Sequence, residues 1–413
     1  MSTNQFPKQC PNCLKRYGDA TRPWCKKCDF SKVFGEWTSG DEAIDELIKM
    51  TQNRQGNYDD NFLEWIPFDR IRDKQKVGQG GYGTVYSAEW IDGKRYWDQS
   101  TRARQPCKVA LKCLNSGTES HQIFIEEVRS HYEVHNTSFM SNSFPMYGLS
   151  QDPDTKEYLI VMPFVENGNL RSFLNKNFHV ADWEFKLQLL YSIAFRLSHI
   201  HSRNMVHRDL HGGNILVMID KDGNGRGEIT DFGLCRSTAD NVEEGDVFGV
   251  LPYIAPEVLK GGTHTLASDI YAFGVIMCEM TTGQSAFCDR AHDVSLLIDI
   301  LNGTQPKILD DTPKEYYQLA KRCLDADPDN RPGAWELRNF FSNRYVSKSV
   351  PPEYRVADER KKDLLPQGSH QIYHTDAIYT SRNLSFTKSV NQLKIANRNQ
   401  DSSQINLQVP DDF

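Results

Sequence analysis

The most informative stretch of this sequence is His207-Arg208-Asp209-Leu210-His211-Gly212-Gly213-Asn214. The carboxylate of Asp209 can accept a proton, and the carboxamide of Asn214, five positions further on, can offer its oxygen to a metal ion. The triplet Asp231-Phe232-Gly233 comes later in the chain and supplies a second carboxylate that can bind a metal. Phosphoryl transfer requires such a set, because cations must neutralise the phosphates while a base receives the proton of the attacking hydroxyl.

A glycine-rich segment lies upstream and reads Gly78-Gln79-Gly80-Gly81-Tyr82-Gly83-Thr84-Val85. Glycines let the backbone approach phosphate closely and take conformations that a Cβ forbids. A dinucleotide-binding fold is the rival interpretation, and it requires a helix directly after the glycines. The residues after this segment are β-branched and aromatic instead, so the pattern predicts a loop between two strands of a hairpin. Taken alone, an ordinary glycine-rich turn fits this segment nearly as well.

A lysine that neutralises phosphate charge is expected at Lys112, the end of the strand-like run Val109-Ala110-Leu111-Lys112. Such a lysine needs a carboxylate to hold it in place, and Glu127 is the candidate, on a segment compatible with a helix. Taken singly, a surface lysine and a helical glutamate are the simpler interpretation of these two residues.

Together with Ala255-Pro256-Glu257, these motifs resemble those of the eukaryotic protein kinase family over about residues 68–345. The resemblance implies an α+β, two-lobed protein kinase fold, with a mainly β N-lobe (68–163) and a mainly α C-lobe (164–345). It assigns Asp209 as the catalytic base, and it implies that Lys112 holds the α- and β-phosphates of ATP and pairs with Glu127. It also implies that Asn214 and Asp231 bind Mg²⁺ (or Mn²⁺).

The same resemblance assigns further roles along the chain. It makes Asp269 the anchor of the catalytic loop and pairs Glu257 with Arg331 as a structural ion pair. The remaining ATP-binding residues that it implies are the glycine loop with the hinge and its flanks: Gly78, Gln79, Gly80, Gly81, Tyr82, Gly83, Val85, Ala110, Met162 (the gatekeeper), Pro163, Phe164, Val165 and Leu216.

His211 and Val250 depart from the residues that serine/threonine kinases usually have. Tyr253, which stands where a tryptophan would be the alternative, favours serine/threonine specificity. His211 stands where such kinases usually have lysine, and Val250 replaces a common threonine. We expect a serine/threonine protein kinase that transfers the γ-phosphate of ATP to protein substrates in intracellular signalling. The alternatives are a weakly active or pseudokinase scaffold that binds ATP, and a tyrosine or dual-specificity kinase.

Regulation by phosphorylation is expected at Arg208, because an arginine beside the catalytic aspartate can pair with a phosphate. Ser237 and Thr238 are the candidate sites, which would make an upstream activating kinase a partner. The alternative is that these are solvated loop residues.

Two C-x-x-C pairs near the start, Cys10, Cys13, Cys25 and Cys28, have spacing that can close a tetrahedral structural Zn²⁺ site. A segment as short as residues 8–30 has few other means of folding. We expect it to bind a protein partner, because it lacks the interleaved basic and aromatic residues of a nucleic-acid reader.

The rest of the chain sets the domain limits. A helix with an apolar face is predicted at residues 39–52, starting with a Ser39–Glu42 capping box, within a linker (31–67) that docks on the kinase domain. Residues 346–413 are polar and aperiodic, which predicts a disordered tail.

The net charge of −7 argues against binding to nucleic acid, and no apolar run is long enough to span a membrane. We therefore expect a cytoplasmic protein, with the nucleus as the alternative. This order of modules resembles the expanded kinase families of mycorrhizal fungi.

Overall fold

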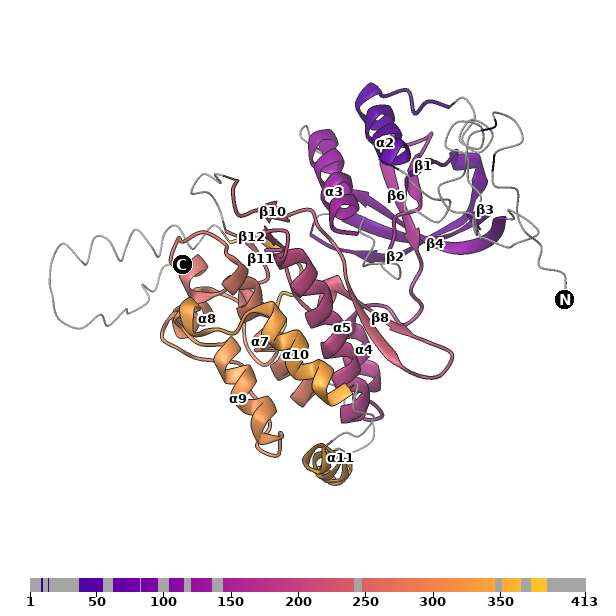
Figure 1. Ribbon diagram of the computed structural model, residues 1–413. Coiled ribbons are helices and arrows are strands. Elements are labelled where there is room, and N and C mark those ends of the chain that lie inside the picture. Colours follow the sequence, from indigo (N-terminus) through magenta and orange to yellow (C-terminus); the bar gives the residue numbers. More distant parts are fainter. Residues whose placement is uncertain are drawn as a thin grey trace, which may run out of the picture. The chain divides into compact units, whose positions relative to one another are not determined.

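The computed structural model describes residues 9, 14, 37–54, 62–81, 83–95, 104–114, 120–135, 144–240, 247–345, 351–364 and 373–384 (Figure 1). The chain divides into two compact units, residues 1–164 and 165–413. The first unit is built on a β-sheet and the second is mainly helical, which confirms the predicted α+β architecture.

The first unit contains a six-stranded sheet in the order β1-β5-β6-β4-β3-β2. Its strands are β1 (Glu64–Trp65), β2 (Ile71–Gln79), β3 (Gly83–Arg95), β4 (Arg104–Leu114), β5 (Gly148–Gln151) and β6 (Tyr158–Pro163). All neighbouring strands run antiparallel except β1, which pairs parallel to β5. The segment before the kinase-like region therefore adds a strand to this sheet.

Helices α2 (Glu42–Arg54) and α3 (Ser120–His135) pack with one face of this sheet. The predicted apolar side chains of α2 are buried in a cluster with residues of α3 and the sheet: Ile44, Leu47, Ile48, Phe124, Val128, Leu149 and Ile160. The predicted start of α2 is wrong, because the helix begins at Glu42. The side chain of Asp41 caps it by accepting hydrogen bonds from the backbone N–H groups of Ala43 and Ile44 at 3.0 and 3.1 Å.

The second unit is built around α5 and α7, most of whose side chains are buried. In α7 this is because the helix is apolar on nearly every face, whereas α5 also buries the polar side chains of Lys186, Gln188 and Arg196. Its helices are α4 (Leu170–Asn177), α5 (Trp183–His201), α6 (Pro256–Leu259), α7 (Leu266–Thr282), α8 (Val294–Leu301), α9 (Lys314–Cys323), α10 (Ala334–Tyr345) and α11 (Pro352–Leu364). The ion pair expected between Glu257 and Arg331 is confirmed, with two N···O distances of 2.7 and 2.8 Å.

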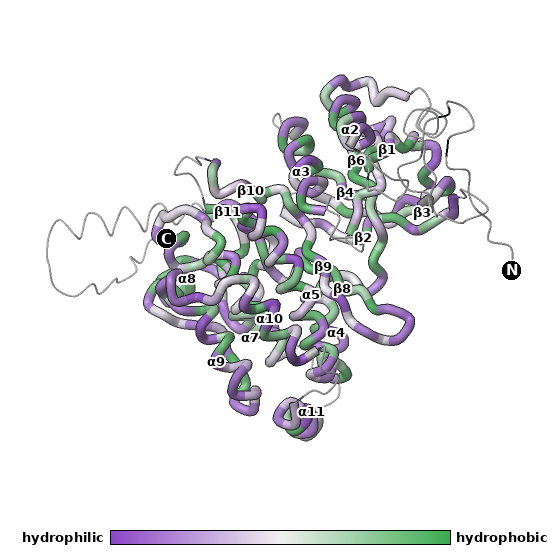
Figure 2. The backbone as a smooth tube through the Cα atoms, viewed as in Figure 1, coloured by the Kyte–Doolittle hydropathy of each residue, from purple (hydrophilic) through white to green (hydrophobic). Residues whose placement is uncertain are grey.

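Three short antiparallel strand pairs complete this unit. They are β7 (Met205–Val206) with β10 (Arg236–Ser237), β8 (Ile215–Ile219) with β9 (Gly225–Ile229), and β11 (Phe248–Gly249) with β12 (Arg382–Asn383). The turn between β8 and β9 is hydrophilic, as its purple colour in Figure 2 shows. None of the helices in the described parts of the chain combines the length and the apolar character needed to cross a membrane.

The prediction of a disordered tail is wrong for residues 351–364 and 373–384. Helix α11 packs on the start of α5, where the carboxylate of Asp358 accepts the backbone N–H of Trp183 at 2.9 Å and Tyr354 is fully buried. The second segment contributes β12. The tail escaped prediction because its contacts come from isolated residues in a polar sequence, with no repeating apolar pattern.

Candidate active site

The glycine-rich segment joins β2 to β3, which confirms the predicted hairpin and rules out the helix of a dinucleotide-binding fold. Gly78 lies opposite Val85, and the N–H of Gly80 donates to the carbonyl of Gly83 at 2.8 Å. A Cβ on Gly83 would lie 2.4 Å from the backbone oxygen of Cys113, so only glycine lets β3 and β4 approach here. Tyr82 lies outside the described residues.

Four of the predicted ATP-binding side chains share one face of the sheet in the first unit. In the register of the strands, Val85 lies opposite Lys112, and Ala110 lies opposite Met162. Because side chains two residues apart on a strand point to the same face, Ala110 and Lys112 point the same way. Of the predicted hinge, Pro163 ends β6 opposite Val109, and the unit boundary falls between Phe164 and Val165.

Lys112 is held by a carboxylate, as the sequence predicted. Its ammonium nitrogen Nζ lies 2.7 Å from Oε1 of Glu127 on α3, and both residues are buried. A buried ammonium needs a partner charge, because desolvation of a lone charge costs far more than a surface ion pair contributes. The pair therefore fixes Lys112 on the face of the sheet that carries the other predicted nucleotide contacts.

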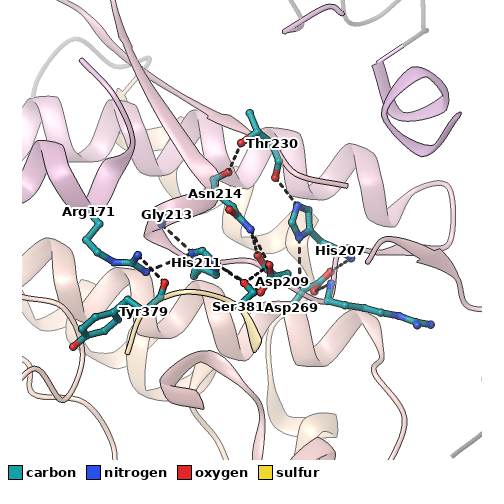
Figure 3. A network of polar contacts seen from close by, with 11 residues as sticks. Arg171, His207, Asp209, His211, Gly213, Asn214, Thr230, Asp269, Tyr379 and Ser381 are labelled. Carbon is teal, nitrogen blue, oxygen red and sulfur yellow. Dashed lines mark hydrogen bonds and ion pairs between the residues drawn. The ribbon is translucent and has the colours of Figure 1, made fainter. Parts of the chain in front are cut away.

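In the second unit, the carboxylate of Asp269 on α7 anchors the loop that carries Asp209. Oδ2 accepts the backbone N–H of His207 at 2.8 Å, and Oδ1 accepts that of Arg208 at 3.0 Å (Figure 3). Burial alone would raise the pKa of Asp269, but the hydrogen bond and charge of His201 outweigh it and hold the pKa below its ordinary value. The anchor is therefore a carboxylate at neutral pH.

Two residues of the site, Arg208 and Asp231, have left-handed backbone conformations, with φ of 69° and 65°. Such conformations are unfavourable for residues other than glycine and persist where surrounding contacts impose them. Arg208 is held by Asp269, and Asp231 is placed by the residue before it.

That preceding residue, Thr230, ties Asp231 to the catalytic loop. Its backbone N–H donates to the carbonyl of Asn214 at 2.9 Å. Nδ1 of His207 accepts the N–H of Asp209 at 3.3 Å, so the ring carries its proton on Nε2, which donates to the carbonyl of Thr230 at 3.1 Å. These bonds link the segments that carry the metal-binding candidates Asn214 and Asp231. The linking roles of His207 and Thr230 were not predicted from the sequence.

The candidate base and the candidate metal ligand Asn214 touch each other. Nδ2 of Asn214 donates to both the backbone oxygen and Oδ2 of Asp209, each at 3.0 Å. The carboxamide oxygen of Asn214 thus stays available as an acceptor. Together with the carboxylate of Asp231 it would offer two oxygen ligands to Mg²⁺, an ion that takes few protein ligands and completes its shell with water and phosphate oxygens.

Asp209 itself is buried, and its Oδ1 atom has no hydrogen-bond partner among the described residues. Burial alone would raise the pKa of this carboxyl, but the adjacent His211 and a hydrogen bond from Ser381 keep the pKa well below its ordinary value. Asp209 is therefore ionised at neutral pH and can accept a proton, as a general base must.

His211, the residue in the usual lysine position, lies beside this carboxylate. Its Nδ1 accepts the backbone N–H of Gly213 at 2.9 Å, which leaves Nε2 as the nitrogen that carries a proton. That nitrogen lies 3.6 Å from Oδ1 of Asp209 and 3.2 Å from the hydroxyl of Ser381. Ser381 was missed in the sequence, where nothing in the polar tail marks it.

The remaining predicted residues are spread over other elements. Leu216 lies on β8, in the second unit. Ser237 ends β10, and the N–H of Thr238 donates to the carbonyl of Asn204 at 2.8 Å. The four cysteines of the predicted zinc site lie outside the described residues. Within the described ranges, no group of three or more His, Cys, Asp or Glu side chains could hold a metal ion.

Burial and the like charge of Arg236 lower the pKa of the Arg208 guanidinium. The Nε atom of Arg208 is buried and has no hydrogen-bond partner in the part of the chain that the structure describes. An anion added beside Arg208 would favour the charged form of this guanidinium, and Ser237 follows Arg236 directly in the chain.

Comparison with known proteins agrees with this geometry. The family model for protein tyrosine and serine/threonine kinases matches residues 71–341. The chain is similar to the probable serine/threonine-protein kinases pats1 (28% identity, covering 71% of this chain and 9% of that protein) and roco5 (29%, 82% and 12%) of Dictyostelium discoideum. It is also similar to the tyrosine-protein kinase Src64B of Drosophila melanogaster (26%, 69% and 49%). The matched region spans less than half the length of each of these relatives.

Proposed function

The chain belongs to the protein tyrosine and serine/threonine kinase family, and on that premise we propose that it transfers the γ-phosphate of ATP to serine and threonine hydroxyls of proteins. The observation that carries the proposal is the carboxylate of Asp209, which is ionised, buried and oriented by Asn214. A serine hydroxyl already lies 2.6 Å from this carboxylate, so an aliphatic alcohol fits at the base. Relatives named as serine/threonine kinases support the same choice of acceptor.

Each residue of the site has a task in this reaction. Asp209 accepts the proton of the substrate hydroxyl, and Lys112, held by Glu127, neutralises phosphate charge. Asn214 and Asp231 would hold the magnesium ion that accompanies ATP, and that ion would neutralise charge developing on the phosphates. The work of the protein is mainly positioning and electrostatic stabilisation, which is why its anchors, above all Asp269, are buried.

Control by phosphorylation is part of the proposal. A phosphate on Ser237 or Thr238 would lie on the loop next to Arg208 and Arg236, and it would offset their mutual repulsion. An upstream kinase would then be a partner.

Several finer proposals rest on the sequence alone. The four N-terminal cysteines would hold a structural zinc ion, and this segment would bind a protein partner. We propose that the protein acts in the cytoplasm or the nucleus, and that it is related to the expanded kinase families of mycorrhizal fungi.

The acceptor residue is tested by incubating the purified chain with γ-labelled ATP, Mg²⁺ and three peptide libraries with fixed Ser, Thr or Tyr. Phosphoamino-acid analysis should find label on serine and threonine. Label on tyrosine alone would overturn the proposed specificity. Nucleotide-dependent thermal stabilisation without any transfer would show that the chain binds ATP as a scaffold.

A further inference from the structure

Residues 373–384 lie along the helical unit, with a turn at residues 374–377, and their last residues add a strand to it. Asn383 pairs with Phe248, and Arg382 pairs with Gly249, in the antiparallel pair of β12 and β11. The N–H of Leu384 donates to the carbonyl of Val247 at 2.8 Å, and its side chain is fully buried. Strand addition of this kind is a common way for a protein to bind a peptide, since backbone bonds give affinity and side-chain pockets give selectivity.

The residues just before Ser381 are also held in place, by side-chain contacts with the helical unit. Nη1 of Arg171 donates to the carbonyl of Tyr379 at 3.0 Å, and the guanidinium lies 4.8 Å from the centre of the Tyr379 ring (Figure 3). The Tyr379 hydroxyl donates to the carbonyl of Ala286 at 2.8 Å. An aromatic side chain two residues before Ser381 is therefore recognised by stacking and by a hydrogen bond.

Between these two anchors, Ser381 points at the candidate base. Its Oγ donates to Oδ2 of Asp209 at 2.6 Å, within the range that a general base needs to take a proton. Nε2 of His211 lies 3.2 Å from the same Oγ, and because Nε2 carries the ring proton it is the donor. The hydroxyl proton of Ser381 is thus directed at Asp209, and the oxygen keeps a lone pair for attack. Ser381 is almost fully buried, whereas its neighbour Thr380 is exposed.

We propose that residues 373–384 occupy the peptide-substrate site of their own kinase domain and that Ser381 is an intramolecular phosphoacceptor; this rests on the proposed function. The Oγ of Ser381 forms a bond to the γ-phosphorus of ATP, while the bond from that phosphorus to the β–γ bridging oxygen breaks. The hydroxyl proton passes to Oδ2 of Asp209, and ADP leaves with the electron pair of the broken bond.

Phosphorylation would change how the segment binds. The product carries a phosphate with a charge of about −1.5 to −2 beside the buried carboxylate of Asp209, where like charges repel. The segment should then leave, which opens the site to other proteins. Before that step it competes strongly, because an attached segment binds intramolecularly and so acts at a high effective concentration.

The test maps phosphate on the full-length chain after incubation with Mg²⁺ and ATP, across a series of dilutions. Wild type and the matched control Thr380→Ala should acquire phosphate at Ser381 with a first-order rate constant that dilution does not change. Ser381→Ala should lose that phosphate and label an added serine peptide more slowly than wild type, because its segment keeps the strand pairing but cannot be phosphorylated and released. Ser381 unmodified while the added peptide is labelled would overturn the proposal, as would a rate proportional to protein concentration.

Docking of the segment has a readout that does not depend on catalysis. Hydrogen exchange at the backbone amide of residue 384 should be slow in the unphosphorylated wild type. In Leu384→Asp the same amide should exchange about tenfold faster or more, because docking of the variant would bury a charge. Equal exchange in both would overturn the docking. If wild type labels neither itself nor any added peptide, the proposed function fails and this proposal with it, whereas silence at Ser381 alone refutes only this one.

Discussion

Replacing Arg331 by alanine should destabilise the helical unit strongly while leaving the chemistry of the site untouched. The Arg331 side chain is fully buried and makes two bonds to the carboxylate of Glu257, at 2.7 and 2.8 Å. It also donates to the carbonyl groups of Ala267 and Asp325, both at 2.9 Å. Arg331→Ala removes all four bonds at once and leaves the Glu257 carboxylate without its partner.

Breaking a buried ion pair costs about 3–5 kcal/mol. Because the Glu257 side chain is 22% exposed and water can reach it, we expect a loss near the lower end, about 3–4 kcal/mol. For a unit of this size that corresponds to a fall in Tm of about 6–16 °C.

The assay is urea unfolding followed by the fluorescence of the chain, with thermal unfolding as a second readout. The matched control is Arg322→Ala, which removes a pair with Glu336 whose side chains are both about half exposed (51% and 50%). A surface pair of that kind contributes no more than about 1 kcal/mol. A loss in Arg331→Ala no larger than in the control would refute the reasoning from burial.

Three further predictions concern the two units separately. Lys112→Met should lower the rate of phosphate transfer about 10²–10³-fold, because it removes one charged group that stabilises the transition state. The control Lys108→Met, at an exposed position of the same strand, should have little effect, and steady-state rates with a serine peptide compare the two variants. Asp269→Ala should reduce the rate and the stability together, because the N–H groups of His207 and Arg208 lose their acceptor; activity and urea midpoints measured on the same preparation test this. The folded pKa of Asp269 is lowered, so its stabilisation is complete above about pH 4, the ordinary pKa of an aspartate, and is lost as pH falls further. The difference in urea midpoint between wild type and Asp269→Asn should therefore shrink below about pH 4, and a constant difference would contradict the assignment.

The fold and the core of the site were accessible from the sequence because several motifs resemble those of protein kinases in residue type, order and spacing. Asp209 and Asn214 are only five residues apart in the sequence and contact each other in the structure, so their spacing already indicated that they lie together. The glycine loop could be assigned to a hairpin because the β-branched and aromatic residues after Gly83 favour a strand over a helix.

The tail was inaccessible for the opposite reason. Ser381 reaches Asp209 across 172 positions of the chain. The segment around it docks through backbone hydrogen bonds and through a few separate side chains such as Tyr379 and Leu384, which leave no repeating pattern in the sequence. The predicted start of α2 was wrong for a different reason. Ser39 and Asp41 are both good helix caps, and spacing alone does not decide between them.

The base is the central claim, and it is tested by phosphate transfer from ATP to a serine peptide in wild type and Asp209→Asn. The matched control is Asp222→Asn, at an exposed position of the turn between β8 and β9. General-base catalysis contributes about 10²–10⁴-fold, so Asp209→Asn should lose activity by that factor at an unchanged thermal midpoint, while Asp222→Asn stays like wild type. Wild-type transfer by a folded Asp209→Asn would contradict the account.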